Sequence, residues 1–176
     1  MQKGRSTDSK RILGIDPGTA TVGYGALLYT ASDTYEYLGS GIIQTLPNTS
    51  AGQRLSMIRS DLISLIKDYC PDVLVVEALF FFKNAKTVMS VAQARGVILE
   101  AAHSMSLSVA EYTPMQVKLH LTGFGRADKR LVQDMIARLL NLPEIIRPDD
   151  ASDALALAVC HARMALAISA QLDTAG

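Results

Sequence analysis

The sequence contains little cysteine and no long apolar segment, and both absences restrict what the protein can be. Only two of the 176 residues are cysteine, which excludes a disulfide framework or a cysteine zinc site and favours a reducing compartment, the cytoplasm. A charged residue interrupts each apolar stretch before it reaches the ~18 residues that a membrane span needs. The sequence therefore predicts neither a signal peptide nor a membrane span.

Disorder of the whole chain is excluded by its composition. Hydrophobic residues make up 49% of the chain and charged residues 19%, a balance that is typical of globular proteins. The length suits a single domain that needs no disulfide or metal to support its core. We expect a polar extension at residues 1–10, one domain at residues 11–170 and a short tail at residues 171–176.

Charge is balanced over the whole chain but not along it. The 17 basic and 17 acidic residues cancel, yet residues 83–138 hold eight basic and four acidic residues, and both flanking segments are acidic. One interpretation is a surface for a polyanion beside a cluster of carboxylates. The other is chance clustering on a solvated surface.

Periodicity and turn signals predict an α/β fold with three antiparallel strands at the start of the chain and strand–helix–strand units after them. β-Branched and aromatic runs mark the strands, and apolar residues at helical spacing mark the helices. The predicted strands are residues 11–15, 21–28, 35–43, 73–76 and 107–110, and the predicted helices are residues 55–66, 88–102, 113–122, 128–140 and 150–167.

Four acids occupy places where side chains project beyond the predicted sheet. Asp16 ends the first strand, and Glu77 ends the strand that the crossover rule places parallel to it. Asp150 and Asp153 share one side of the first turn of the last helix, near its positive end. Each acid alone has an ordinary explanation, as a turn former, a solvated strand end or a helix cap.

Together, the four acids predict a metal site. Carboxylates gathered without cations raise one another's pKa, so their natural partner is a hard divalent cation. No P-loop lysine follows Asp16, no Ser-His-Asp or Cys-His arrangement is found, and His103, His120 and His161 lack metal-site spacing. Two Mg²⁺ ions about 4 Å apart would suit phosphodiester hydrolysis.

Short sequence blocks extend the pattern over nearly the whole chain. They are residues 11–18 (RILGIDPG), 23–25 (GYG), 76–77 (VE) with Phe80, 83–85 (KNA), 93–97 (QARGV), 116–118 (QVK), 123–125 (GFG), 127–129 (ADK) and 150–156 (DASDALA). In this order they closely resemble the RuvC family of Holliday-junction resolvases. The QARG and DxxDAL blocks are far more specific than GIDxGT alone, which sugar kinases, actin-like ATPases and small RuvC-like nucleases share.

The resemblance implies an RNase H-like mixed sheet flanked by helices and a crossover junction endodeoxyribonuclease that acts in DNA recombination and repair. It implies that Asp16, Glu77, Asp150 and Asp153 hold two Mg²⁺ ions per subunit, with Mn²⁺ able to substitute. Lys118 is expected to act near the scissile phosphate, and Phe80 to stack on a base at the opened crossover. The residues expected to contact DNA are Phe80, Phe81, Lys83, Asn84, Lys118 and Lys129, whereas Phe82 is expected in the core.

A homodimer is expected because a four-way junction has near two-fold symmetry and is cut in two strands. The predicted helix at residues 88–102 is apolar on more than one stripe, and its small residues would admit a second helix. It could instead be buried between the sheet and later helices of its own chain, but the resemblance favours the dimer. The expected interface residues are Val88, Val91, Ala92, Arg95 and Ile98. A branch-migration complex of the RuvA and RuvB type is a further expected partner.

Two alternatives to a junction resolvase remain. A non-cutting nucleic-acid-binding module of the same fold would be expected to have lost an acid, and all four acids are present. A small RuvC-like nuclease that acts on RNA is disfavoured by the match through residues 93–96.

Overall fold

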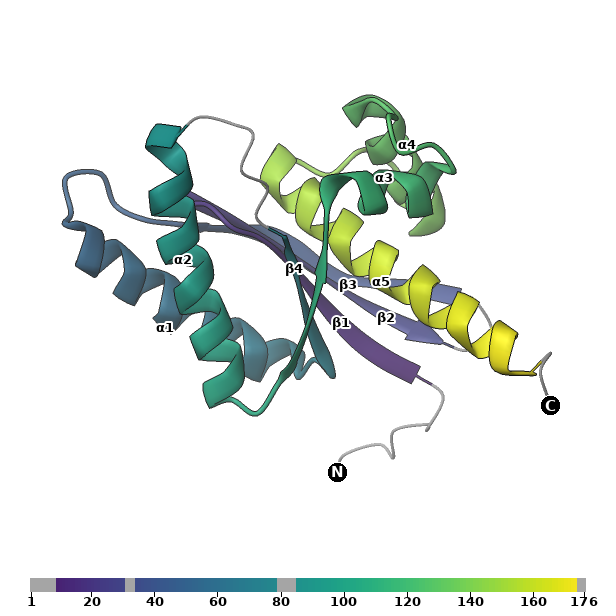
Figure 1. The fold of residues 1–176 in the computed structure, drawn as a ribbon, viewed down its shortest axis with the longest axis horizontal. Coiled ribbons are helices and arrows are strands. Elements are labelled where there is room, and N and C mark those ends of the chain that lie inside the picture. The colour runs from purple at the N-terminus through teal and green to yellow at the C-terminus, as the bar shows by residue number, and fades with distance from the viewer. Residues whose placement is uncertain (1–8, 31–33, 79–84, 174–176) are drawn as a thin grey trace.

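The computed structural model describes residues 9–30, 34–78 and 85–173, without the side chains of residues 85–87 and 166–173. Its five strands form one mixed sheet between two layers of helices (Figure 1). The strands are β1 (Ser9–Asp16), β2 (Thr21–Thr30), β3 (Thr34–Gln44), β4 (Val73–Glu77) and β5 (Ser108–Tyr112). The helices are α1 (Ala51–Tyr69), α2 (Ala85–Ser104), α3 (Pro114–Thr122), α4 (Lys129–Leu139) and α5 (Asp149–Asp173).

The sheet has the order β3-β2-β1-β4-β5, with β1 at its centre. β2 is antiparallel to β1 and β3, while β4 is parallel to both β1 and β5. This confirms the predicted mixed sheet. Because Ile15 pairs with Val76 in the parallel β1–β4 ladder, both strands end at the same edge of the sheet.

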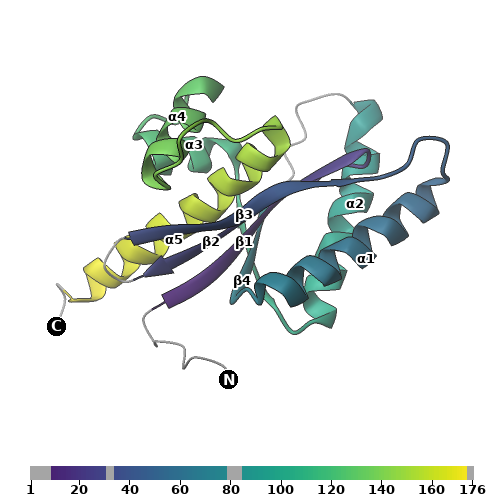
Figure 2. The same cartoon turned by 180° about the vertical axis from the view of Figure 1, so that it is seen from behind.

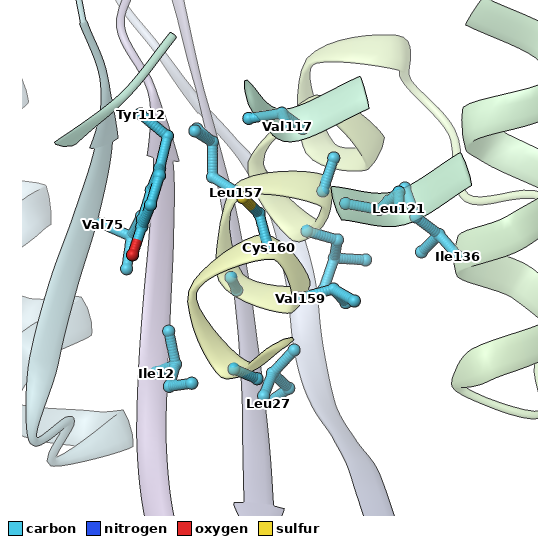
Figure 3. Packing of buried hydrophobic residues seen from close by; sticks show 14 of the residues in the cluster. Ile12, Leu27, Val75, Tyr112, Val117, Leu121, Ile136, Leu157, Val159 and Cys160 are labelled. Carbon is cyan, nitrogen blue, oxygen red and sulfur yellow. The ribbon is translucent and has the colours of Figure 1, made fainter. Parts of the chain in front are cut away.

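Side chains alternate between the two faces of the sheet and build two cores. Leu13 and Ile15 of β1 contact the cluster under α1 and α2, whereas Ile12 belongs to the cluster under α3, α4 and α5. Figure 2 shows α1 and α2 together on one face, and Figure 3 shows the second cluster around Cys160 of α5. The alternative that α2 is buried by later helices of its own chain is therefore wrong, because those helices cover the opposite face.

The ends of the elements follow local chemistry. Thr113 and Gln116 form the predicted capping box at the start of α3, and Gly123 ends this helix with a φ of 77°. β1 begins at Ser9 and α5 continues to Asp173, so secondary structure extends a few residues beyond the predicted domain limits at both ends. None of the described helices is both long enough and apolar enough to cross a membrane.

Candidate active site

Strand alternation directs two of the predicted acids to the same side of the sheet. Asp16 shares a face of β1 with Ile12, which packs under α5. Glu77 shares a face of β4 with Val75, which packs in the same cluster. The parallel register places both strand ends side by side, so Asp16 and Glu77 project toward α5 at one edge, as the crossover rule predicts.

Glycines in β1 and β2 let the start of α5 lie directly against the sheet. A Cβ atom at Gly23 would lie 2.0 Å from the carbonyl oxygen of Asp150, and one at Gly14 would lie 2.0 Å from that of Ala154. Such contacts are sterically impossible, so a larger residue at either position would displace α5. The close approach brings Asp150 and Asp153 to the edge that carries Asp16.

A cavity of about 210 Å³ opens at this edge and collects most of the predicted site residues. Its charged lining residues are Asp16, Glu77, Asp153, Lys118 and Lys129, and its wall includes apolar groups from α3, α4 and α5. The structure thus brings together three of the four acids and both predicted lysines. Asp150 does not line the cavity, but its charge acts on Asp16.

Burial and surrounding negative charge both act on Asp16 in the cavity. Burial, followed by the charges of Glu77, Asp153 and Asp150, raises the pKa of Asp16 from 3.8 to about 7, and the nearby Lys129 opposes this shift. An ionised Asp16 therefore needs further positive charge beside it. The part of the shift that comes from the neighbouring carboxylates is the repulsion that the sequence pattern predicted, whereas the largest single cause is burial.

Lys129 links the cavity to an acid that sequence reasoning missed. Its Nζ atom lies 2.9 Å from Oδ2 of Asp153 and 3.1 Å from Oδ2 of Asp149. Asp149 also accepts hydrogen bonds from Gln133, at 3.2 Å, and from Arg147. The hydrogen bond from Lys129 lowers the pKa of Asp149. Although partial burial opposes it, hydrogen bonding to both carboxylates raises the pKa of Lys129. The sequence signal that could have identified Asp149 is its position directly before Asp150.

The donor set fits a hard divalent cation, because carboxylate oxygens are the ligands that Mg²⁺ prefers. The raised pKa of Asp16 means that its ionised form is disfavoured in the cavity, and a cation bound beside it would favour that form. Among the described residues, however, no three His, Cys, Asp or Glu side chains are already grouped around one metal position. One oxygen of Asp153 is instead held by the ammonium group of Lys129. Asp16, Glu77, Asp150 and Asp153 are the residues that could hold the metal.

The predicted DNA contacts between β4 and α2 lie outside the described residues. These contacts are Phe80, Phe81, Lys83 and Asn84. Phe82, which was expected in the core, also lies outside the described residues. Of the predicted DNA-binding residues, the structure therefore describes Lys118 and Lys129 alone, and both line the cavity.

The predicted dimer residues on α2 have different surroundings. Val88, Val91 and Ala92 are partly exposed. Arg95 forms an ion pair with Glu111 of β5 in its own chain. The expectation for Ile98 was wrong, because its side chain is fully buried in the core under α1 and α2 and cannot face a second subunit.

Comparison with known proteins relates most of the described residues to one family. The family model described as crossover junction endodeoxyribonuclease RuvC matches residues 12–161. The RuvC of Fusobacterium nucleatum is 45% identical over 151 residues, covering 86% of this chain and 79% of that protein. The RuvC of Halothermothrix orenii is 49% identical over 150 residues, covering 85% of this chain and 90% of that protein.

Solved structures give the same relationship. The chain superimposes with a TM-score of 0.85 and 32% identity on T. thermophilus RuvC in complex with a Holliday junction substrate, covering 89% of this chain and 95% of that one. A second Thermus thermophilus RuvC structure matches with a TM-score of 0.80 and 32% identity over 88% of this chain and 95% of that one. The RNase H-like fold is thereby confirmed. The chain belongs to the RuvC family of crossover junction endodeoxyribonucleases.

Proposed function

We propose that this protein resolves four-way DNA junctions by metal-dependent hydrolysis of one phosphodiester bond in each of two strands, in DNA recombination and repair. The observation that carries the proposal is a cavity lined by Asp16, Glu77 and Asp153 together with Lys118 and Lys129, in which the pKa of Asp16 is raised to about 7. The related T. thermophilus RuvC, which has the same fold, was solved with a Holliday junction substrate.

The four acids have one shared role, which is to hold Mg²⁺ or Mn²⁺, with two ions per subunit. When bound, the metal supplies an activated water and stabilises the leaving oxygen. Asp16 must lose its proton to take part, so its raised pKa makes metal binding weaker below neutral pH. Oδ2 of Asp153 would have to release the ammonium of Lys129 before it could bind the metal.

The two lysines have separate roles. Lys118 lies half-buried in the wall of the cavity, where water screens its charge less than on an open surface, and it stabilises the negative charge that develops on the scissile phosphate. Lys129 is more exposed and already paired with carboxylates, so it contributes chiefly to the affinity for the DNA backbone. Phe80, Phe81, Lys83 and Asn84 remain predicted DNA contacts.

The protein acts as a homodimer whose subunits meet through α2. Met89 of this helix is 69% exposed, Val88 and Ala92 beside it are partly exposed, and Val91 is partly exposed on another side of the helix. No Cβ contact would form at Gly96, so the helix surface is open there. A two-fold pair of subunits supplies the two active sites that paired cuts require.

The working environment is the cytoplasm, with a branch-migration complex of the RuvA and RuvB type as a partner.

Cleavage of a synthetic four-way junction tests the proposal most directly. Junction DNA, matched linear duplex and a four-way RNA junction are each incubated with Mg²⁺ or with EDTA. We expect paired cuts in the DNA junction with Mg²⁺ alone. Asp16→Asn should abolish the cuts but leave junction affinity intact, whereas the exposed Asp61 of α1 offers a matched control, Asp61→Asn, that should cut normally. Binding without cleavage by the parent protein would favour the non-cutting module, and preference for the RNA junction would favour an RNA nuclease.

A further inference from the structure

Two side chains of α5, beyond its acidic first turns, contact the segment that carries Lys118. Nδ1 of His161 lies 2.9 Å from the hydroxyl oxygen of Tyr112, the last residue of β5. Nη1 of Arg163 donates hydrogen bonds to the carbonyl oxygens of His120, at 2.7 Å, and Leu121, at 3.1 Å, in the last turn of α3. These contacts reach the two ends of the segment from Tyr112 to the end of α3.

The Tyr112 contact fixes the beginning of this segment. Tyr112 stands in register with Glu77, and its carbonyl oxygen accepts a hydrogen bond of 2.9 Å from the N–H of Ala78. The next residue, Thr113, caps α3. Figure 3 shows the Tyr112 ring lying between the sheet and α5. Through Tyr112, His161 thus ties α5 to the strand end that carries Glu77 and to the start of α3.

The Arg163 contact fixes the end of the segment. The last four carbonyl groups of a helix have no partner within it. Gly123 satisfies the carbonyl of Leu119 in α3, and Arg163 satisfies the next two. A cation at this end is also attracted by the helix dipole. Hydrogen bonds at both ends therefore complement the apolar contacts of Val117 and Leu121, and unlike those contacts they are directional.

We propose that His161, Tyr112 and Arg163 are positioning residues that set the place of Lys118 relative to the carboxylates. α5 carries Asp150 and Asp153 at its start and His161 and Arg163 farther along. Asp150 and Asp153 are thus part of α5, and Lys118 of α3 is tied to the same helix through Tyr112 and Arg163, so α5 acts as a common frame. The inference rests on the proposed function in one respect, the action of Lys118 on the scissile phosphate.

A double-mutant cycle between Arg163 and Lys118 tests the inference. At saturating protein, Arg163→Met should slow single-turnover cleavage roughly tenfold or more, because small displacements of a catalytic group are costly. The dissociation constant for the junction should stay the same. In a Lys118→Met background, Arg163→Met should cause no further loss of rate. Arg163→Lys, which can still donate to the carbonyl groups, should restore part of the rate, and Arg54→Met on α1 is the matched control.

The outcomes separate the inference from the proposed function. If Lys118→Met alone cuts at the parent rate, the assigned role of Lys118 fails. If Lys118→Met is slow and Arg163→Met lowers its rate by the same factor as in the parent, the positioning role is overturned. Hydrogen exchange of the α3 amides gives a readout without catalysis: it should accelerate in Arg163→Met, and unchanged protection contradicts the inference. Should Arg163→Met not fold, Tyr112→Phe, which loses only a hydroxyl group, takes its place in the cycle with the same expected results.

Discussion

Lys129 and Asp153 form an ion pair at the cavity that Asp16 and Glu77 line, with 2.9 Å between Nζ and Oδ2. Their side chains are 49% and 41% exposed. Ion pairs this open to water contribute only ~0–1 kcal/mol, so another charged group can replace either partner at little cost. The pair therefore keeps Asp153 neutralised in the free protein and can yield to a metal ion on one side and to a phosphate on the other.

Replacing Lys129 should weaken DNA binding more than catalysis. Lys129→Met removes one phosphate contact, so we expect the junction affinity to fall several-fold at low salt and the salt slope to decrease by about 1. Fluorescence anisotropy over a salt series measures both quantities. The neighbouring Arg130 pairs with Asp134 on the outer side of α4, and Arg130→Met serves as the control. A salt slope that stays at the parent value in Lys129→Met would contradict the assigned phosphate contact.

Asp16 should make the protein less stable as the pH rises. The pKa of Asp16 is about 7 in the folded protein against 3.8 for an ordinary aspartate, so the folded state binds more protons between these values. Stability is then lost as the pH rises through this window, and above it the ionised carboxylate costs on the order of a few kcal/mol. Asp16→Asn should therefore melt at a higher temperature than the parent at about pH 8 in EDTA, and the difference should vanish near pH 4.

Thermal melts of both proteins across this pH range provide the measurement. Added Mg²⁺ should narrow the difference at high pH, because binding to the parent's carboxylates stabilises the folded state. A constant difference at all pH values would mean that the substitution acts through packing and not through charge.

Gly23 should tolerate no larger side chain. In Gly23→Ala the new methyl group would meet the backbone of Asp150, so α5 must move away from β2 at a cost of ~1–3 kcal/mol or more. Cleavage should fall further than stability alone explains, because Asp150 and Asp153 move with α5. Gly52 of α1 has no atom within 4 Å of an added Cβ, so Gly52→Ala is the control and should be neutral or stabilising by about 0.5–1 kcal/mol. Equal melting temperatures for the two variants would refute the close-packing argument.

A charge on α2 should prevent dimerisation without unfolding the subunit. Val91→Glu places a carboxylate at a partly exposed position, so we expect a folded monomer that nicks a cruciform plasmid but does not linearise it. Sedimentation and the ratio of linear to nicked product measure the effect. Leu46→Glu, at a 60% exposed site after β3, is the control. Ile98→Glu should instead lose ~3–5 kcal/mol by burying an unpaired charge. A monomeric Val91→Glu protein that still yields linear product would exclude this interface.

The sequence predicted those parts of the site that depend on local rules. Asp16 and Glu77 each end a buried strand, and the handedness of the crossover is nearly invariant, so their proximity could be derived without a structure. Gly14 and Gly23 were recognised only as members of matching blocks, because their role depends on a helix more than a hundred residues farther along the chain.

The wrong prediction for Ile98 and the failure to identify His161 and Arg163 also follow from contacts between distant parts of the chain. Ile98 was assigned to an interface because α2 is apolar on several sides, and periodicity cannot tell whether α1 or a second subunit covers each side. His161 and Arg163 showed no motif spacing, since their partners on β5 and α3 are reached only through the folded chain. Predictions from sequence held where neighbours in the fold are set by strand order and failed where they are set by helix packing.

Because β1 is the central strand of the sheet, the residues of the site should leave their native positions at different temperatures. Asp16 lies on a strand that is hydrogen-bonded on both sides, whereas α3 packs on one face of the domain with Met115 and Leu119 exposed. Elements with few buried contacts open at lower free energy than central strands. On warming, Lys118 should therefore leave the cavity while the strand that bears Asp16 remains intact. The temperature at which cleavage stops would then lie below the melting temperature of the domain, and cooling from this interval would restore activity without refolding the sheet.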